Sequence, residues 1–253
     1  MRLGTPNAIV LAETGEPPLW QRWLRRAAKF WNRAMEAAEG SLVRQALQAS
    51  IQLAAANMPP ARQSWAAQLA AGLAAVGVPL DLMQPAPICL AALKDACQER
   101  QLSQFQQAAA RQGATKLQQY DANIAGGLMG SGRFGSREGY LDVVRQRRQR
   151  EALAQLRTGS HWGAEETGRW ARVPREQRCC PHCSGGAVED VPHMLLVCPL
   201  YDPIRATYSD LFSDPSKTAC MSSFLNQDPC RLASYAHACR QCWQEASPEP
   251  PPI

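Results

Sequence analysis

The feature that most constrains the fold of this chain is a short pattern of three cysteines and one histidine. The pattern is C-x2-C-x9-H-x4-C, and it is formed by Cys180, Cys183, His193 and Cys198. Two cysteines separated by two residues form a tight knuckle that aims both thiolates at one cation. Zn²⁺ prefers four nitrogen and sulfur ligands in a tetrahedron, and a site closed by four protein ligands is structural. The pattern therefore predicts one structural zinc ion; the alternative is buried thiols beside a surface histidine.

Residues beside the pattern refine the choice of ligands. Cys179 could replace Cys180, but only Cys180 gives the usual two-residue gap. His182 lies inside the knuckle and is predicted to be exposed or an outer contact. A helix is predicted to carry His193 on its first turn and Cys198 at its end, with Glu189 and Asp190 at its N-terminus. Because five residues turn an α-helix through about 500°, this helix has to unwind at Cys198.

A second set of cysteines lies in a predicted helix over residues 231–244. A single residue between the histidine and the next cysteine places those two on opposite sides of that helix, so packing or exposed thiols are favoured over a second metal site. The set consists of Cys230, His237, Cys239 and Cys242.

The chain has ten cysteines, and no secretory signal precedes them. Thiols stay reduced inside cells, so clustered cysteine and histidine indicate metal binding before disulfides. We therefore expect an intracellular protein, nuclear or cytoplasmic. The longest uncharged run, 63–80, is interrupted by glycine and proline and predicts a buried alanine-rich helix. We expect no association with a membrane.

Positive charge is concentrated in one part of the sequence. The chain carries 27 lysines and arginines against 22 acids, a net charge of +5, and residues 133–178 alone hold 11 arginines against 6 acids. Guanidinium groups match phosphate geometry, so this excess favours a polyanionic partner such as RNA or DNA; the alternative is a solvated helix face. The predicted phosphate contacts, which approach the knuckle, are Arg169, Arg172, Arg175 and Arg178.

Apolar residues recur at helical spacing through most of the chain, and few stretches alternate with period two. This predicts a mainly α fold with a helical connection region, a small zinc-stabilised module and no large sheet. An extended lead-in is predicted over 1–16. The predicted helices are 17–39, 42–56, 61–76, 88–122 in one or two pieces, 139–157 and 231–244. The predicted domains are a helical connection region 1–125, a Gly-rich linker 126–138, an Arg-rich helix and zinc module 139–212, and a helical or disordered tail 213–253.

Ordered short motifs surround the four ligands. The order of these motifs resembles the region downstream of the reverse transcriptase in LINE-type non-LTR retrotransposon polyproteins, a region that carries a zinc-binding module of this kind. The resemblance is specific over 154–212 and weaker over 1–40. It rests on Arg157-Thr-Gly-Ser-His161, Gly168-Arg-Trp170, Arg178, Glu189-Asp190, Cys198-Pro-Leu-Tyr201 and Arg205, and near the start on Thr5-Pro6-Asn7, Val10-Leu-Ala-Glu13, Pro18-Leu19 and Phe30-Trp31-Asn32.

The resemblance implies a non-catalytic fragment that binds RNA or an RNA–DNA hybrid beside the polymerase domain of a parent polyprotein. No polymerase or endonuclease motif is recognisable, so no catalytic residue is carried over and no enzyme activity is expected. Met1 is expected to be an internal methionine of a truncated element. The alternatives are a zinc-stapled protein-interaction scaffold, and a decayed element fragment without nucleic-acid affinity.

Two further motifs have simpler explanations. The sequence Gly130-Ser-Gly132-Arg-Phe-Gly135 matches G-x-G-x-x-G, but no strand precedes it, so a flexible linker is favoured over a dinucleotide site. His161 with Trp162 and Trp170 could form a platform for stacked bases, and core packing of the two tryptophans is the favoured alternative.

Overall fold

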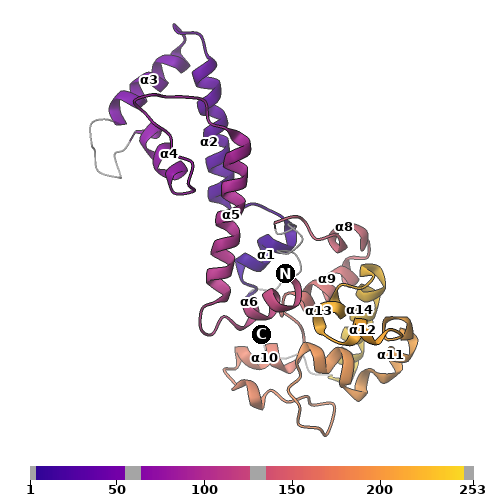
Figure 1. The fold of residues 1–253 in the computed structure, drawn as a ribbon. Coiled ribbons are helices and arrows are strands. Elements are labelled where there is room, and N and C mark those ends of the chain that lie inside the picture. The colour runs from indigo at the N-terminus through magenta and orange to yellow at the C-terminus, as the bar shows by residue number, and fades with distance from the viewer. Residues whose placement is uncertain (1–3, 55–63, 126–134, 248–253) are drawn as a thin grey trace. The chain divides into compact units, whose positions relative to one another are not determined.

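The computed structural model describes residues 4–54, 64–125 and 135–247 (Figure 1). In these ranges the chain is helical with turns and loops, and the only β-pairing is an isolated bridge between Cys179 and Val188. The predicted mainly α fold without a large sheet is confirmed for this part of the chain. Most of the predicted linker 126–138, including nearly all of the Gly130–Gly135 motif, lies outside the described residues.

The chain divides into two compact units. One is formed by residues 17–107, and the other combines 1–16 with 108–253. The predicted connection region 1–125 is therefore shared between both units. None of the described helices is long and apolar enough to cross a membrane.

The unit 17–107 is built from helices close to the predicted ranges. Pro18 precedes the first helix, and the Ser64 side chain caps the third by accepting a hydrogen bond from Ala67 N. The last helix extends two residues past the end of this unit. The helices are α2 (Leu19–Glu36), α3 (Leu42–Ala54), α4 (Trp65–Ala74) and α5 (Leu90–Ala109).

The core of this unit lies between α2, α3, α4 and α5, and is centred on the fully buried Trp31. Trp31 Nε1 donates to the carbonyl of Ala86 at 3.0 Å. The Asn32 side chain both donates to Ile88 O and accepts from Ile88 N, at 2.9 and 2.7 Å. These bonds fix the loop before α5 against α2. The side of α2 that bears Arg22, Arg26, Lys29 and Arg33 is exposed to solvent.

The second unit is a set of shorter helices in which α9 packs against α14 (Figure 1). The predicted helix 139–157 is interrupted, because the buried Val144 adopts an extended conformation between two shorter helices. The α-helices are α1 (Asn7–Thr14), α6 (Thr115–Tyr120), α8 (Tyr140–Val143), α9 (Arg147–Arg157), α10 (Ala164–Trp170), α11 (Asp202–Thr207), α12 (Pro215–Thr218), α13 (Met221–Leu225) and α14 (Pro229–Ala246). The other helical turns are η2 (Asp121–Ala125), η3 (Arg175–Gln177), η4 (His193–Val197), η5 (Pro199–Tyr201) and η6 (Ser209–Leu211).

The prediction of an extended lead-in over 1–16 is wrong, because residues 7–14 form α1. Ile9 and Glu13 of α1 are completely buried in the second unit. Gly15 ends the helix in the left-handed region at φ +64°, where a Cβ would lie 2.3 Å from the Arg137 backbone nitrogen. Tertiary burial therefore outweighs the weak local signal of a short segment.

A buried ionic cluster connects α1 to α9. The Arg157 guanidinium contacts the carboxylate of Glu13 at 3.0 Å and that of Glu138 at 2.7 Å. Tyr120 donates its hydroxyl hydrogen to Glu13 at 2.9 Å. One cation thus contacts two buried carboxylates, and Glu13 accepts a further hydrogen bond from Tyr120.

The segment predicted as a helical or disordered tail forms α12, α13 and α14 up to residue 246. Phe224, Leu232 and Tyr235 from this segment are fully buried. Tyr235 donates a hydrogen bond to Leu195 O at 2.5 Å. The end of the chain therefore supplies part of the core on which the cysteine and histidine pattern rests.

Candidate metal centre

A short hairpin-like loop positions the first two cysteines. Cys180 N donates to Ala187 O at 2.8 Å, and Glu189 N donates to Arg178 O at 3.0 Å. Gly186 turns the chain with φ +60°. This loop folds back on itself, so Cys180 and Cys183 face the segment that follows.

A single π-helical turn, η4, positions the other two residues. The Asp190 carboxylate accepts a hydrogen bond from His193 N at 3.0 Å, which caps the turn. Cys198 N donates to His193 O at 2.8 Å across five residues, and Cys198 itself is extended with ψ 125°. The predicted unwinding at Cys198 is confirmed. The wide turn brings side chains five residues apart onto one side, which a regular α-helix does not do.

These two segments bring all four predicted ligands together. Their ligand atoms, three sulfurs and one imidazole nitrogen, lie within 4.8 Å of one another. Cys180 Sγ lies 3.7 Å from Cys198 Sγ, and Cys183 Sγ lies 3.5 Å from His193 Nε2. Cys183 is half-buried and the other three are buried. The arrangement can hold a metal ion.

The neighbouring residues that competed as ligands lie outside this group. Cys179 is exposed, and its thiol points to Glu176 O at 3.5 Å. His182 makes outer contacts: its ring lies edge-on to Trp243 at 6.4 Å, and its Nε2 is 3.2 Å from Ser247 Oγ.

In the part of the chain that the structure describes, the four ligands are the only group of three or more cysteine, histidine or acidic residues close enough to share an ion. The second set is dispersed: Cys239 is buried, Cys230 is exposed and points to Val143 O, and Cys242 points to Leu200 O.

Burial changes the acidity of two of the thiols. Loss of hydration raises the pKa of Cys180 to about 12, and it also raises the pKa of Cys198. In the metal-free chain these sulfurs therefore keep their protons at neutral pH. A cation has to displace those protons when it binds, so binding releases acid.

Glu189 is a residue of this centre that the sequence did not reveal. It is buried, and its two carboxylate oxygens accept hydrogen bonds from Ala164 N at 2.5 Å and from Trp243 Nε1 at 3.1 Å. The Cys180 thiol approaches the same carboxylate at 3.9 Å. Glu189 thus connects the cysteine loop to α10 and α14. The sequence indicated only a role at a helix N-terminus, which Asp190 performs.

The four predicted phosphate contacts have different surroundings. Arg175 pairs with Glu165 at 2.8 Å and with Asp190 at 3.1 Å. Arg178 donates to two backbone carbonyls, at 2.8 Å each. The Arg175 side chain therefore ties this segment to Asp190 beside the metal loop, and the Arg178 side chain ties it to α10.

The other two arginines are more available. Arg169 pairs with Glu166 at 3.1 Å, but 39% of its side chain stays exposed. Arg172 is exposed on a turn with φ +56°, and no hydrogen bond or ion pair of its side chain is found among the described residues. The structure therefore separates Arg169 and Arg172 from Arg175 and Arg178.

The proposed stacking platform is split. Core packing, predicted for both tryptophans, is confirmed for Trp162 and wrong for Trp170, which is 59% exposed. His161 is buried as well. The Arg169 guanidinium lies 5.7 Å from the centre of the Trp170 ring. One exposed indole therefore stands beside the two available arginines.

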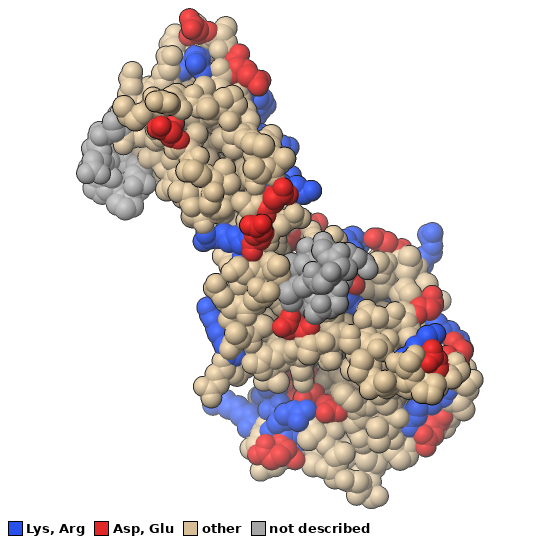
Figure 2. All heavy atoms as spheres, in the orientation of Figure 1, with Lys and Arg blue, Asp and Glu red and all other residues tan. Residues whose placement is uncertain are grey.

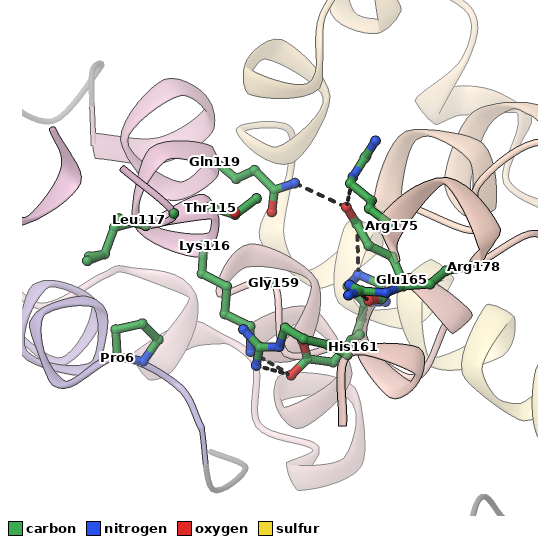
Figure 3. Close-up of a pocket in the computed structure, with 14 residues that line it drawn as sticks. Pro6, Thr115, Lys116, Leu117, Gln119, Gly159, His161, Glu165, Arg175 and Arg178 are labelled. Carbon is green, nitrogen blue, oxygen red and sulfur yellow. Dashed lines mark hydrogen bonds and ion pairs between the residues drawn. The ribbon is translucent and has the colours of Figure 1, made fainter. Parts of the chain in front are cut away.

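A cavity of about 270 Å³ lies between α6 and α10, next to this segment (Figure 3). Four basic side chains and two carboxylates line it: Lys116, Arg169, Arg175 and Arg178 against Glu165 and Glu166. Lys116 Nζ and Glu166 form a buried ion pair at 2.5 Å. On the face drawn in Figure 2, basic and acidic side chains are interspersed in the same way. The lining of the cavity therefore has two more basic side chains than carboxylates.

Glu165 gives this region a predicted pH dependence. Burial would raise the pKa of Glu165, but the imidazole of His161 at 3.7 Å and the hydrogen-bonded guanidinium of Arg175 at 2.8 Å lower it to about 2. A lowered carboxyl pKa stabilises the fold above the unfolded pKa, and this contribution disappears as the pH falls through the folded pKa.

We expect Glu165→Gln to cost about 2 kcal/mol at pH 7, with allowance for the half-exposed Arg175. The difference from the parent chain should shrink between about pH 5 and pH 2. Urea unfolding at several pH values measures this, with exposed Glu176→Gln as the control. A difference that is independent of pH would contradict the assignment.

Comparisons of the sequence with known protein families, with curated proteins and with solved structures gave no match. The likeness to retrotransposon polyproteins therefore rests on the motif residues alone, and the chemistry of the site has to be argued from its geometry.

Proposed function

We propose that this chain is a non-catalytic zinc-binding module that binds the backbone of RNA or of an RNA–DNA hybrid. The observation that carries the proposal is the group of four ligands beside a segment with exposed Arg169, Arg172 and Trp170. A backbone hydrogen bond from Glu189 N to Arg178 O joins this segment to the loop that bears the ligands.

The spacing of the ligand atoms supports zinc. With Zn–S bonds of about 2.3 Å, two sulfurs of a tetrahedral site are about 3.8 Å apart. With a Zn–N bond of about 2.05 Å, sulfur and nitrogen are about 3.6 Å apart. Two of the six distances among the ligand atoms match these values: 3.7 Å between the sulfurs of Cys180 and Cys198, and 3.5 Å between Cys183 Sγ and His193 Nε2. All six lie within 4.8 Å. Thiolate-rich sites also select zinc over magnesium or calcium.

The role of the metal would be structural. Four protein ligands leave no position for a water molecule or a substrate, so the ion would not act as a Lewis acid. Its contribution would be to hold the loop 178–189 against η4, since this loop has little apolar surface of its own. Zinc binding would therefore be coupled to local folding.

Nucleic-acid binding is supported by the residues that remain available on the adjoining segment. Arg169 and Arg172 would contact phosphates, and Trp170 would stack on an unpaired base. Arg175 and Arg178 would join them only by exchanging their present partners. The resemblance of the surrounding motifs to LINE-type polyproteins supports the same role, beside the polymerase domain of a parent protein.

Replacing both available arginines, Arg169→Ala with Arg172→Ala, is expected to weaken binding of single-stranded RNA. The slope of log affinity against log salt should become shallower by about 1.4, which is about 0.7 for each phosphate that the variant no longer neutralises. Fluorescence anisotropy over a range of salt concentrations measures both quantities.

The matched control replaces two exposed arginines of the same unit, Arg137 and Arg147, which pair with Asp142 and Glu151 away from the metal loop. This control removes the same charge and should leave the slope nearly unchanged. Equal effects of the two double variants would reduce the proposal to general electrostatic attraction. An unchanged slope in both would overturn it.

A protein-interaction scaffold is the second candidate, and it is favoured by the internal partners of Arg175 and Arg178. If these pairings are permanent, the arginine-rich segment serves the fold more than a ligand. A folded, zinc-loaded chain that retains neither RNA nor DNA at low salt would support this function over the first.

A further inference from the structure

The solvent-facing side of α2, in the unit 17–107, carries a row of four basic side chains. Its exposed basic residues occur at spacings of four, three and four, which places them in one stripe along the helix. No acidic residue occurs on α2 before Glu36. At 1.5 Å per residue the stripe is about 16 Å long, enough for a few consecutive phosphates. The stripe consists of Arg22, Arg26, Lys29 and Arg33.

Aromatic side chains border this stripe. Trp23 is 45% exposed and Phe30 is 44% exposed, seven residues apart on the same helix. Trp23 also lines a cavity of about 230 Å³ between α2, the end of α4 and α5. Trp20, Leu24, Val76 and Arg100 line the cavity too. The cavity is thus mainly apolar and has an exposed indole at its edge.

Two side chains, Arg100 and Gln104, supply most of the polar groups that line this cavity. The Arg100 guanidinium lies 5.8 Å from the centre of the Trp20 ring and donates a hydrogen bond to Ala75 O. This contact holds the planar guanidinium in place beside an indole. The Gln104 side chain, at the edge of the cavity, offers an amide donor and acceptor.

We propose that this surface binds single-stranded nucleic acid, with one unpaired base in the cavity against Trp23 and the adjoining phosphates on the α2 stripe. Indole and guanidinium planes are the groups that proteins stack on bases, and the positive row complements the backbone that such a base carries. The site belongs to a different unit from the metal centre and does not rest on the function proposed there.

Other occupants of this surface fit it less well. The apolar side of α2 is buried in the core of its unit through Leu24, Ala28 and Trp31. A bilayer would meet only exposed Leu19, Trp23 and Phe30, and it would leave the cavity unused. An acidic peptide would use the row of charge but would not require a cavity lined by indole rings. A nucleotide uses both features, because its base fits the cavity and its phosphate meets the row of charge.

The first test compares Trp23→Ala with Leu19→Ala in the full-length, zinc-loaded chain. Leu19 is 82% exposed on the same helix and does not line the cavity. Trp23→Ala should weaken binding of a short oligouridine by about five- to a hundredfold, and Leu19→Ala should leave it nearly unchanged. Trp23→Phe should restore most of the affinity, since it keeps an aromatic ring.

Inorganic polyphosphate, which has charge but no bases, is the second probe. Trp23→Ala should leave polyphosphate binding unchanged. The double variant Arg26→Ala with Arg33→Ala should weaken binding of both oligouridine and polyphosphate. Equal losses for both ligands in Trp23→Ala would overturn the proposal. So would tight binding of anionic vesicles or an acidic peptide by a chain that does not bind the oligonucleotide.

Filling the cavity gives an independent variant. A Cβ at Gly72 would lie 3.1 Å from Leu24 Cδ1 and 3.5 Å from the Trp23 ring, so Gly72→Val projects methyl groups into the space for the base. Ala71→Val, at an exposed neighbouring position, is the matched control. Only Gly72→Val should lose oligouridine affinity; equal affinity in both variants would contradict a base in the cavity.

Photocrosslinking with 5-iodouridine in the oligonucleotide separates this site from the metal centre. The proposal expects crosslinks to Trp23 or Trp20 that persist when Arg169 and Arg172 are replaced. Crosslinks confined to Trp170 would overturn this inference and leave the function proposed for the zinc module standing. Crosslinks confined to the α2 region would support this inference and contradict nucleic-acid binding by the zinc module.

Discussion

Removing zinc from the loaded chain is expected to unfold the region around residues 178–201. Structural zinc sites in small modules contribute about 10–16 kcal/mol of apparent binding free energy at neutral pH, and that energy is coupled to folding. Here the hairpin-like loop has few buried side chains besides Cys180 and Glu189. Metal analysis should find about one zinc ion per chain. Chelation should abolish amide protection in the loop and in η4.

Cys183→Ser and His193→Ala should lose the metal and the protection together. Cys179→Ser is the matched control, because Cys179 is adjacent to the site and exposed, and its thiol points away to Glu176 O. It should keep both. A well-folded parent chain without zinc, or a control variant as deficient as Cys183→Ser, would refute the assignment of the four ligands.

The second large effect is expected at Arg157. Arg157→Met leaves the carboxylates of Glu13 and Glu138 buried without their shared cation, and breaking a buried pair in this way costs about 3–5 kcal/mol. Urea unfolding monitored by circular dichroism should show this loss. Arg147→Met, ten residues earlier on α9 and exposed to solvent, should leave the stability nearly unchanged.

A compensating variant tests the cause of that loss. Adding Glu13→Gln and Glu138→Gln to Arg157→Met removes the unpaired charges, so the triple variant should recover part of the lost stability. A triple variant that is less stable than Arg157→Met would show that the ions themselves, and not their pairing, hold α1 in place.

The parts of this structure that the sequence predicted are those with a local cause. Helices α2, α3 and α14 follow from apolar spacing and from the prolines and glycines at their ends. The four metal ligands follow from spacing too, because a knuckle and a single helical turn are enough to bring them together. Even the unwinding at Cys198 follows from counting residues per turn.

What the sequence did not predict depends on residues far apart in the chain. Helix α1 is short, and it is stabilised by the burial of Ile9 and by the pairing of Glu13 with Arg157, 144 positions later. Glu189 meets Trp243 across 54 positions. No local pattern signals either pairing. The same limit applies to the arginines: their spacing indicated a phosphate surface, but only the fold shows that Arg175 and Arg178 already have partners.

The contact between Glu13 and Arg157 also sets an order of events during synthesis. At about 5–20 residues per second, Glu13 is made about 7–30 s before its cation exists, and the whole unit 17–107 is made in between. In that interval Glu13 lacks its cation, and the later part of its unit has not been made. The unit 17–107 can fold while the other unit is still incomplete, and α1 can dock against α9 only after Arg157 has been made. Any chaperone or competing surface that binds α1 during those seconds would delay the whole C-terminal unit.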